Sequence, residues 1–220
     1  MTVLRYAPDA RYGSTPLHSR YRIDGYHAEQ MSDFDDGPLF FTGDDPMSVA
    51  SDLLNTIDLL ADPADRLTAV DHLQAFLAGH GYPTGPVTAD DLGATRKLRE
   101  QLRAVWQAGE VSTAADRLNT LLGRHRPSLR VRVSGDDVEV GYGDRAAPAR
   151  GLIEEILGAL AHEIGQHGVS RLGTCDGDPC RCAFVDRTRN RTRRYCCDIC
   201  TSRAAAAAYR RRKRAQSTSG

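Results

Sequence analysis

The chain has 220 residues, and its 40% apolar content suffices for one medium-sized domain followed by a smaller one. It contains no run of eighteen apolar residues and no apolar signal core at the N-terminus, which excludes a membrane-spanning helix and favours the cytoplasm. The formal net charge is zero, but residues 171–220 hold 13 basic against 4 acidic side chains, an imbalance that indicates contact with nucleic acid.

Clear helical patterns begin only near residue 44. Residues 1–38 show neither a helical nor a strand period, so we expect an extension that either is flexible or folds only against something else. A first helix begins at Asp44 or Asp45, with Pro46 at the first helical position, where the missing N–H of proline has no cost. A second helix is predicted over residues 65–78. Apolar residues recur at the helical period in both segments, which predicts that each helix buries one face.

Two further helices follow in the same region. The third opens at Thr88, a typical capping residue, with Asp91 three positions later in the arrangement of a capping box. The fourth is predicted over residues 112–123. The basic side chains of the third helix are expected to face solvent; they are Arg96, Lys97, Arg99 and Arg103.

A hairpin and a fifth helix complete the first domain. Residues 129–133 and 138–142 alternate apolar and polar side chains on either side of a glycine-containing turn, which is typical of a β-hairpin. The fifth helix is predicted over residues 148–167. Residues 39–170 are therefore interpreted as one mainly helical domain that holds one β-hairpin.

The fifth helix contains His162, Glu163 and His167, which invite comparison with zinc hydrolases. Those enzymes need two histidines four residues apart on one helix face, whereas these are five apart and lie about 140° round the helix. The chain also lacks a glycine-rich phosphate loop and a nucleophile elbow. The sequence therefore favours a protein that is not an enzyme.

All six cysteines lie between residues 175 and 200. Cys175 and Cys180 form one short pair, Cys196 and Cys200 form another, and fifteen residues separate the two pairs. Each short pair can wrap two thiolates around one ion, which is the usual encoding of a structural zinc site. We predict that these four cysteines hold one structural Zn²⁺, with Cys197 as the alternative to Cys196.

Two other uses of the cysteines remain open. One is a disulfide framework, which the lack of a secretory signal disfavours. The other is a redox switch, in which a spare thiol, Cys182 or Cys197, lies beside a metal-bound one.

The residues around the cysteine pairs predict a second hairpin and a sixth helix. Residues 183–185 are predicted to pair with residues 193–195, with Asn190 near the turn because asparagine tolerates positive backbone angles. The alanines at 204–208 have the highest helix propensity. The interpretation is an α+β chain that ends in a small treble-clef-like zinc finger over residues 171–214, followed by a disordered tail over 215–220.

Two parts of the chain resemble known families. The segment FVDRTRNRTRRYC, residues 184–196, resembles the CGNR zinc finger, together with its flanking cysteines and Arg203. The name-giving Cys-Gly-Asn-Arg stands here as Cys200, Thr201, Ser202 and Arg203, so the ligand and the arginine are kept while the middle residues differ. The segment DLLNT, residues 52–56, and the leucine-rich helices resemble the ABATE domain that precedes this finger in stress-induced transcription regulators of bacteria.

The resemblance implies a DNA-binding transcription regulator. Its helical domain is expected to serve effector sensing or protein contacts, with Asn55 and Asp58 as polar groups in apolar surroundings; Asn55 is alternatively a hydrogen-bonded residue of the core or between helices. The basic residues support DNA binding independently of the resemblance, because guanidinium groups bind phosphate and form hydrogen bonds with guanine edges. Arg203 is the first candidate for a sequence-specific contact, followed by Arg193 and Arg194. The residues expected to contact double-stranded DNA are Arg187, Arg189, Arg191, Arg193, Arg194, Arg203, Arg210, Arg211, Arg212, Lys213 and Arg214.

Other functions fit the same residues. The chain is alternatively an interaction protein that docks on RNA polymerase or another regulator, or a zinc thiol redox sensor. The basic helix is alternatively solvated, with Arg194 and Arg203 bracing the zinc finger. Either a homodimer or the help of another protein is expected in the DNA-binding interpretation, because a single finger reads few base pairs. No feature of the sequence identifies a small-molecule effector.

Overall fold

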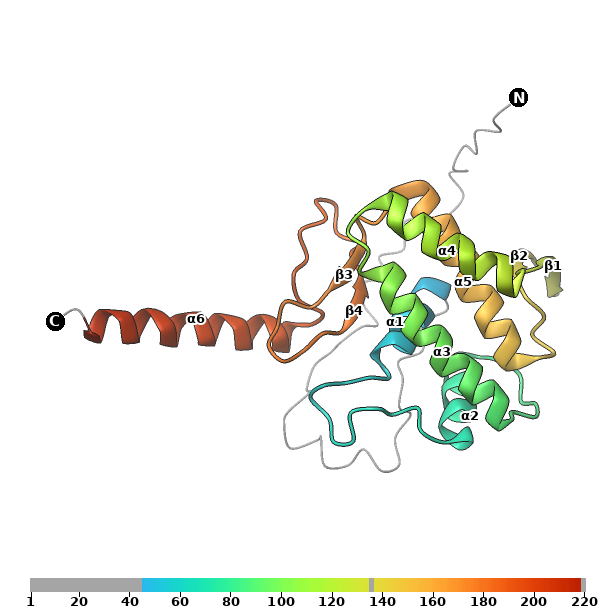
Figure 1. Cartoon of the computed structure of the whole chain (residues 1–220), viewed down its shortest axis with the longest axis horizontal. Coiled ribbons are helices and arrows are strands. Elements are labelled where there is room, and N and C mark those ends of the chain that lie inside the picture. Colours follow the sequence, from blue (N-terminus) through green and yellow to red (C-terminus); the bar gives the residue numbers. More distant parts are fainter. Residues whose placement is uncertain (1–44, 135–136, 219–220) are drawn as a thin grey trace, which may run out of the picture. The chain divides into compact units, whose positions relative to one another are not determined.

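The computed structural model describes residues 45–134 and 137–218, and in this part of the chain it confirms a mainly helical α+β fold (Figure 1). In chain order the elements are α1 (Pro46–Asn55), α2 (Val70–Gly79), α3 (Ala89–Trp106), α4 (Val111–His125), β1 (Leu129–Ser134), β2 (Asp137–Tyr142), α5 (Pro148–His167), β3 (Leu172–Thr174), β4 (Ala183–Val185) and α6 (Asp198–Thr218). The extension expected over residues 1–38 lies outside the described residues, and α6 runs into the segment 215–220. In the described ranges, no helix combines the length and the apolarity that a membrane span requires.

Helices begin where the sequence places local capping signals. Asp45 caps α1 by accepting a hydrogen bond from the Met47 N–H at 3.3 Å, and Pro46 occupies the first helical position. Thr88 and Asp91 form the predicted capping box at the start of α3. Both starts follow from side chains within three residues of the helix.

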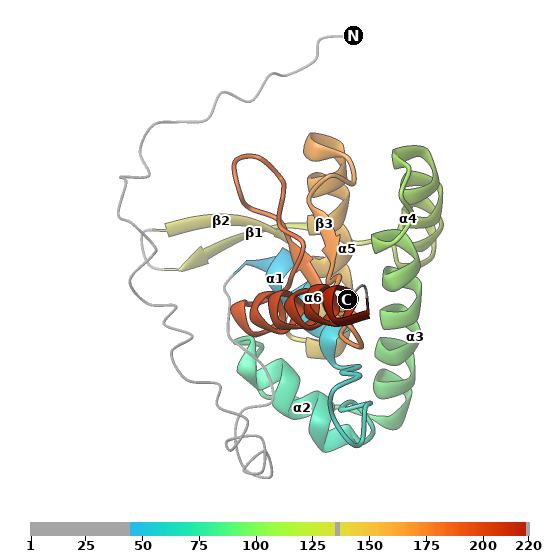
Figure 2. The ribbon, with the colours of Figure 1, turned by 90° about the vertical axis from the view of Figure 1, so that its left-hand side faces the viewer.

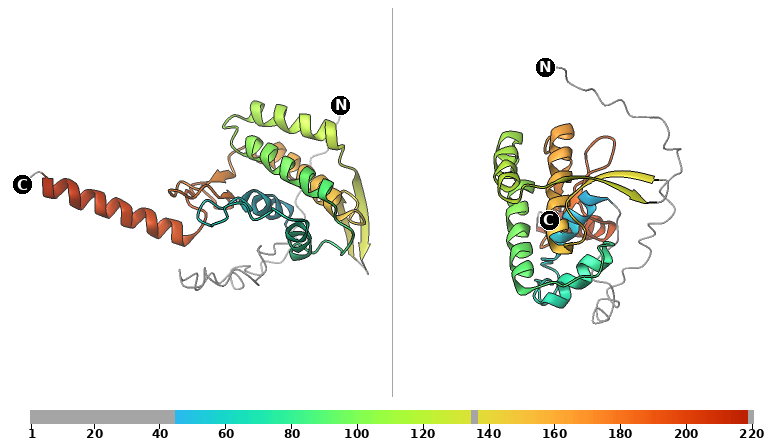
Figure 3. Two further views of the ribbon diagram at one scale, coloured as in Figure 1. Left: turned by 60° about the horizontal axis from the view of Figure 1, so that its bottom comes forward. Right: turned by 90° about the vertical axis from the view of Figure 1, so that its right-hand side faces the viewer.

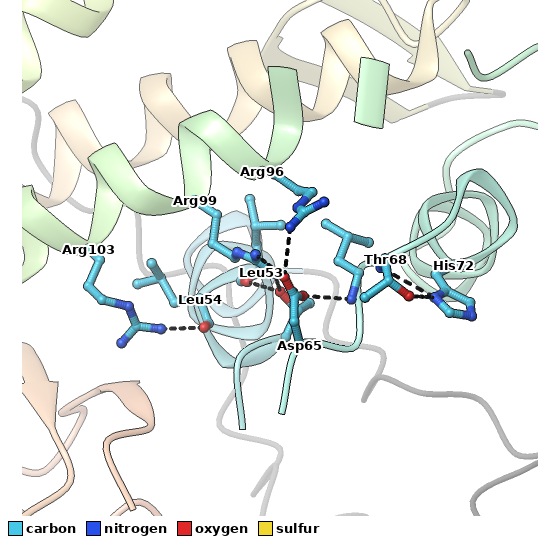
Figure 4. A network of polar contacts seen from close by, with 10 residues as sticks. Leu53, Leu54, Asp65, Thr68, His72, Arg96, Arg99 and Arg103 are labelled. Carbon is cyan, nitrogen blue, oxygen red and sulfur yellow. Dashed lines mark hydrogen bonds and ion pairs between the residues drawn. The ribbon is translucent and has the colours of Figure 1, made fainter. Parts of the chain in front are cut away.

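The start of α2 differs from the prediction because a long-range ion pair holds Asp65 in the preceding loop. The Arg99 guanidinium donates from Nη1 and Nη2 to the two Asp65 carboxylate oxygens at 2.7 and 2.8 Å (Figure 4). The helix therefore begins at Val70 and not at residue 65. The expectation that Arg99 faces solvent is also wrong: the residue is 1% exposed, and its Nη1 also donates to the buried Thr56 hydroxyl at 2.7 Å.

Helix α5 forms the centre of the core and contacts α1, α3 and α4 (Figures 1 and 2). Four of its apolar side chains are fully buried, namely Leu152, Ile156, Leu157 and Leu160. The β1–β2 hairpin joins α5 where the Tyr142 ring packs on Gly158, because a Cβ at that glycine would lie 2.2 Å from the ring. This close approach requires glycine in the middle of the helix.

The rest of the hairpin stays largely outside the core. Its register places Val131 opposite Val140, as the alternation in the sequence predicts. However, the apolar face remains open to solvent, with exposed fractions of 63% for Leu129 and Val140, 68% for Val131 and 71% for Val133. The hairpin is therefore anchored through Tyr142, while α1 packs against β4 of the C-terminal segment and α3 contacts β3 through Trp106 (Figure 3).

Candidate zinc centre and basic surface

The four cysteines of the two predicted pairs come together in one cluster. Cys175 and Cys180 lie in the loop between β3 and β4, Cys196 precedes α6, and Cys200 lies in the first turn of α6. Their sulfurs all lie within 4.8 Å of one another, and Cys196 Sγ is 3.7 Å from both Cys180 Sγ and Cys200 Sγ. Tetrahedral zinc with Zn–S bonds of about 2.3 Å separates its sulfurs by about 3.8 Å. The cluster therefore fits one structural zinc ion.

Backbone N–H groups stabilise the cluster from outside. The amides of Gly177 and Cys196 each donate to Cys175 Sγ at 3.4 Å, an arrangement that favours a thiolate. The Gly177 backbone also lies close to Cys175 Sγ, since a Cβ at this glycine would lie 3.3 Å from that sulfur. Cys175, Cys180 and Cys200 are 2–3% exposed. Three of the four candidate ligands are thus buried and Cys196 is partly buried, and four protein sulfurs leave no open coordination position, as in a structural zinc site.

The two spare cysteines lie beside this cluster and not within it. Cys197 Sγ is 3.8 Å from Cys196 Sγ, while Cys182 is half-buried among the same side chains. The group of four that can share one ion contains Cys196 and omits Cys197.

The strand pairing in the zinc module, residues 171–218, corrects the predicted hairpin. Strand β4 pairs antiparallel with β3, so that Thr174 lies opposite Ala183 and Gly173 opposite Phe184. Residues 193–195 form no strand. The residue with positive φ in this loop is Arg191, at 52°, and not Asn190.

The physical reason is Asp186, which the sequence analysis did not single out. Its buried carboxylate accepts hydrogen bonds from the Thr188 N–H at 2.8 Å, the Thr188 hydroxyl at 2.6 Å and the Arg193 N–H at 2.9 Å. Burial alone would raise the pKa of Asp186, but these hydrogen bonds hold it below its usual value. The carboxylate folds residues 187–194 into a loop, which leaves β4 free to pair with β3.

Two arginines of this loop tie it to neighbouring elements. Arg187 forms an ion pair with Asp45, the residue that caps α1. Arg191 donates from Nη1 to the Ser170 hydroxyl at 2.7 Å. All three arginines are exposed, but Arg189 makes no hydrogen bond or ion pair with the described residues. Of these three, only Arg189 has a guanidinium that internal contacts leave available.

Two more arginines brace the zinc cluster. Arg193 lies over the Phe184 ring at 4.8 Å and donates to the carbonyls of Tyr195 and Cys196, at 2.9 Å for Tyr195. Arg194 forms an ion pair with Asp176 at 2.9 Å. The bracing role expected for Arg194 and Arg203 therefore belongs to Arg193 and Arg194.

Helix α6 carries the remaining basic residues on an exposed surface. Every side chain described from Thr201 onward is exposed or half-buried, and no other described helix or strand lies alongside α6 in Figures 1 and 3. Its basic side chains, all exposed, are Arg203, Arg210, Arg211, Arg212, Lys213 and Arg214. The zinc cluster fixes only the first turn of α6, through Cys200.

The zinc module is docked on the helical domain by Asn55. Its amide Nδ2 donates to the Ala183 carbonyl at 2.9 Å, and its Oδ1 accepts the Ala183 N–H at 2.7 Å. Ala183 can form both bonds because it lies in a non-hydrogen-bonded pair with Thr174, so its polar groups point away from β3. The Trp106 indole adds a hydrogen bond to the Gly173 carbonyl at 2.8 Å.

Of the two roles that the sequence allows for Asn55, the hydrogen bonds to Ala183 favour the structural one over a contact to a ligand. A pocket of about 390 Å³ lies between α2 and residues 82–87, and neither Asn55 nor Asp58 lines it. Asp58 instead accepts the Leu60 N–H at 2.9 Å and faces Arg66 at 3.5 Å. The sequence signal for Asn55 was an amide at the end of an apolar helical stripe, but its partner is 128 residues away.

We expect Asn55→Asp to weaken the docking of the zinc module and to lower the free energy of unfolding by roughly 2–3 kcal/mol. The carboxylate cannot donate to the Ala183 carbonyl, and it places a negative charge against that oxygen. Chemical denaturation measures the loss, and hydrogen exchange measures protection of the Ala183 N–H. Asn119→Asp, at an exposed position on α4, is the matched control. Equal stability of the two variants would contradict the docking role.

Comparison with known protein families gives two matches. The ABATE family model, described as "Putative stress-induced transcription regulator", matches residues 48–167. The CGNR zinc finger model matches residues 171–213, although Thr201 and Ser202 depart from its name-giving motif. A search of curated proteins found no significant match.

Proposed function

Because the chain belongs to the ABATE family of stress-induced transcription regulators, we propose that it regulates transcription by binding double-stranded DNA through the zinc module and α6. The observation that carries this proposal is the exposed cationic helix, whose first turn contains the zinc ligand Cys200. A helix fixed at one end by a metal site presents its charges in a defined direction. Neither matched family is an enzyme family.

The division among the basic residues supports distinct roles on DNA. Arg187, Arg191, Arg193 and Arg194 are exposed but engaged in contacts that shape the loop, whereas the side chains of Arg189, Arg203 and Arg210 make no hydrogen bond or ion pair with the described residues. Exposed cations that neutralise phosphates release counterions, which gives affinity without sequence information. The α6 cations therefore supply most of the electrostatic attraction.

The salt dependence of DNA binding tests this proposal. For the full chain, the logarithm of the association constant should fall linearly with the logarithm of salt concentration, with a slope of about −0.9 per neutralised phosphate. The double variant Arg211→Gln/Lys213→Gln should reduce the magnitude of the slope by about 2 and weaken binding roughly tenfold or more at low salt. Fluorescence anisotropy on a labelled duplex measures both quantities.

The control removes two cations that lie outside α6. Arg96→Gln/Arg117→Gln, on α3 and α4, should leave the slope unchanged. A wild-type chain that binds no duplex would reject the proposal, as would identical slopes for the α6 variant and the wild type. In that event, docking on another protein of the transcription apparatus becomes the leading alternative.

A further inference from the structure

The cations of α6 fall on different sides of the helix. Arg203 and Arg210 are seven residues apart and Arg214 follows four residues later, so at 3.6 residues per turn the three lie within an arc of about 40°. Arg212 lies on the opposite side, about 180° from the centre of that arc. The helix therefore has a ridge of three arginines, here called the Arg203 face, and a cation of equal charge directed away from it.

Small residues separate the arginines of this face. Residues 204–208 are all alanine, so the helix is narrow over these positions, and the exposed Tyr209 that follows them lies about 120° from the centre of the Arg203 face. The major groove of B-DNA is about 12 Å wide, and an α-helix with ordinary side chains has a diameter of about 10–12 Å. Alanines allow the axis of α6 to approach the groove floor closely, so that arginines on either side reach base edges.

The loop arginines are less suited than the α6 arginines to contact base edges. Arg193 and Arg194 are engaged with the Tyr195 carbonyl and with Asp176, at 2.9 Å in each case. To read a base, either side chain would first have to give up a contact that braces the zinc cluster. The exposed Arg203 and Arg210 have no hydrogen bond or ion pair to described residues to give up.

We propose that α6 lies in the major groove with the Arg203 face toward the bases, and that Arg203 and Arg210 determine sequence specificity by bidentate contacts to guanine. This inference rests on the proposed DNA-binding function and adds the groove, the reading face and the base. Arg212 faces away and contributes charge only. Bidentate pairing of arginine with guanine O6 and N7 is the commonest specific contact in this groove.

The spacing of the two arginines predicts the spacing of the guanines. Seven residues at a rise of about 1.5 Å separate them by about 10 Å along the helix axis. The major groove runs obliquely to the DNA axis, so this length covers about two to three base pairs, similar to the span read by a zinc-finger helix. The preferred site therefore contains two guanines about two to three base pairs apart.

Selection from a randomised duplex library with the full zinc-loaded chain tests the inference. The wild type should enrich two guanines at this spacing. Arg203→Lys should lose the preference at one guanine and Arg210→Lys at the other, each by about tenfold or more, because lysine keeps the charge but not the bidentate fork. The matched control, Arg212→Lys, should retain the wild-type preference. All three variants should bind random duplex at low salt within about twofold of the wild type, since the charge is unchanged.

The outcomes separate this inference from the function on which it rests. Salt-sensitive binding without base preference would overturn the reading face and leave DNA binding intact. The same holds if Arg212→Lys changes the selected site as much as Arg210→Lys does. Failure of the wild type to bind any duplex would reject DNA binding itself. Zinc content and far-ultraviolet circular dichroism of each variant confirm that the compared chains are folded.

Discussion

Replacing Cys200 by serine is expected to abolish stoichiometric zinc binding and to unfold the segment between Cys175 and Cys200. Structural zinc sites contribute about 10–16 kcal/mol of apparent binding free energy in zinc-finger peptides, far more than three-residue strands supply by themselves. Because Cys200 also lies in the first turn of α6, the helix would lose its fixed direction. Elemental analysis should give one zinc per wild-type chain and a clear deficit in the variant, and duplex affinity should fall with it.

The spare thiols provide the control for this experiment. Cys182→Ser and Cys197→Ser should each keep one zinc per chain, because neither sulfur belongs to the group that can share one ion. Loss of zinc in Cys197→Ser with retention in Cys196→Ser would reverse the ligand assignment. Full zinc occupancy in Cys200→Ser would reject the four-cysteine site.

The second large effect is expected from Arg99→Met, which should lower the free energy of unfolding by roughly 3–5 kcal/mol. The substitution keeps an unbranched apolar stem but leaves the Asp65 carboxylate and the buried Thr56 hydroxyl without their common donor. Arg96 contacts the same carboxylate at 3.4 Å with 46% of its side chain exposed, so Arg96→Met should cost less than about 1 kcal/mol. Urea denaturation at neutral pH measures both variants.

The same ion pair predicts a pH dependence. The hydrogen bonds from Arg99 hold the pKa of Asp65 below its usual value. The stability that the Asp65–Arg99 ion pair contributes is therefore complete above about pH 4. It is lost as the pH falls through the lower pKa that Asp65 has in the folded state. The stability difference between wild type and Arg99→Met should shrink below pH 4. A constant difference down to pH 2 would show that lost packing, and not the ion pair, causes the effect.

Sequence reasoning succeeded where the determinants are local. Asp45 with Pro46, and Thr88 with Asp91, fixed two helix starts through contacts within three residues, and cysteine spacing identified the zinc ligands. It failed where the partner is distant along the chain. The start of α2 depends on Arg99, 34 residues beyond Asp65, and such a pairing leaves no trace in helical periodicity.

The zinc module shows the same contrast between features set by neighbouring residues and features set by distant ones. Strands of three residues are too short to show a period of two, so the pairing of β4 with β3 was not visible in the sequence. A count of arginines cannot separate those that brace a loop through internal contacts, such as Arg193, from those without an internal partner, such as Arg210. That distinction required the positions of Phe184 and of the backbone carbonyls near Cys196.

The amide of Asn55 has one more consequence, for self-association of the folded chain. The edge strands of a short sheet present unpaired N–H and C=O groups, and another polypeptide can pair with such an edge as an extra strand. In this protein the outward polar groups of Ala183 are already satisfied by a side chain of α1. Asn55 thus blocks the addition of a strand at Ala183. Its side-chain amide is too small to act as a new edge strand.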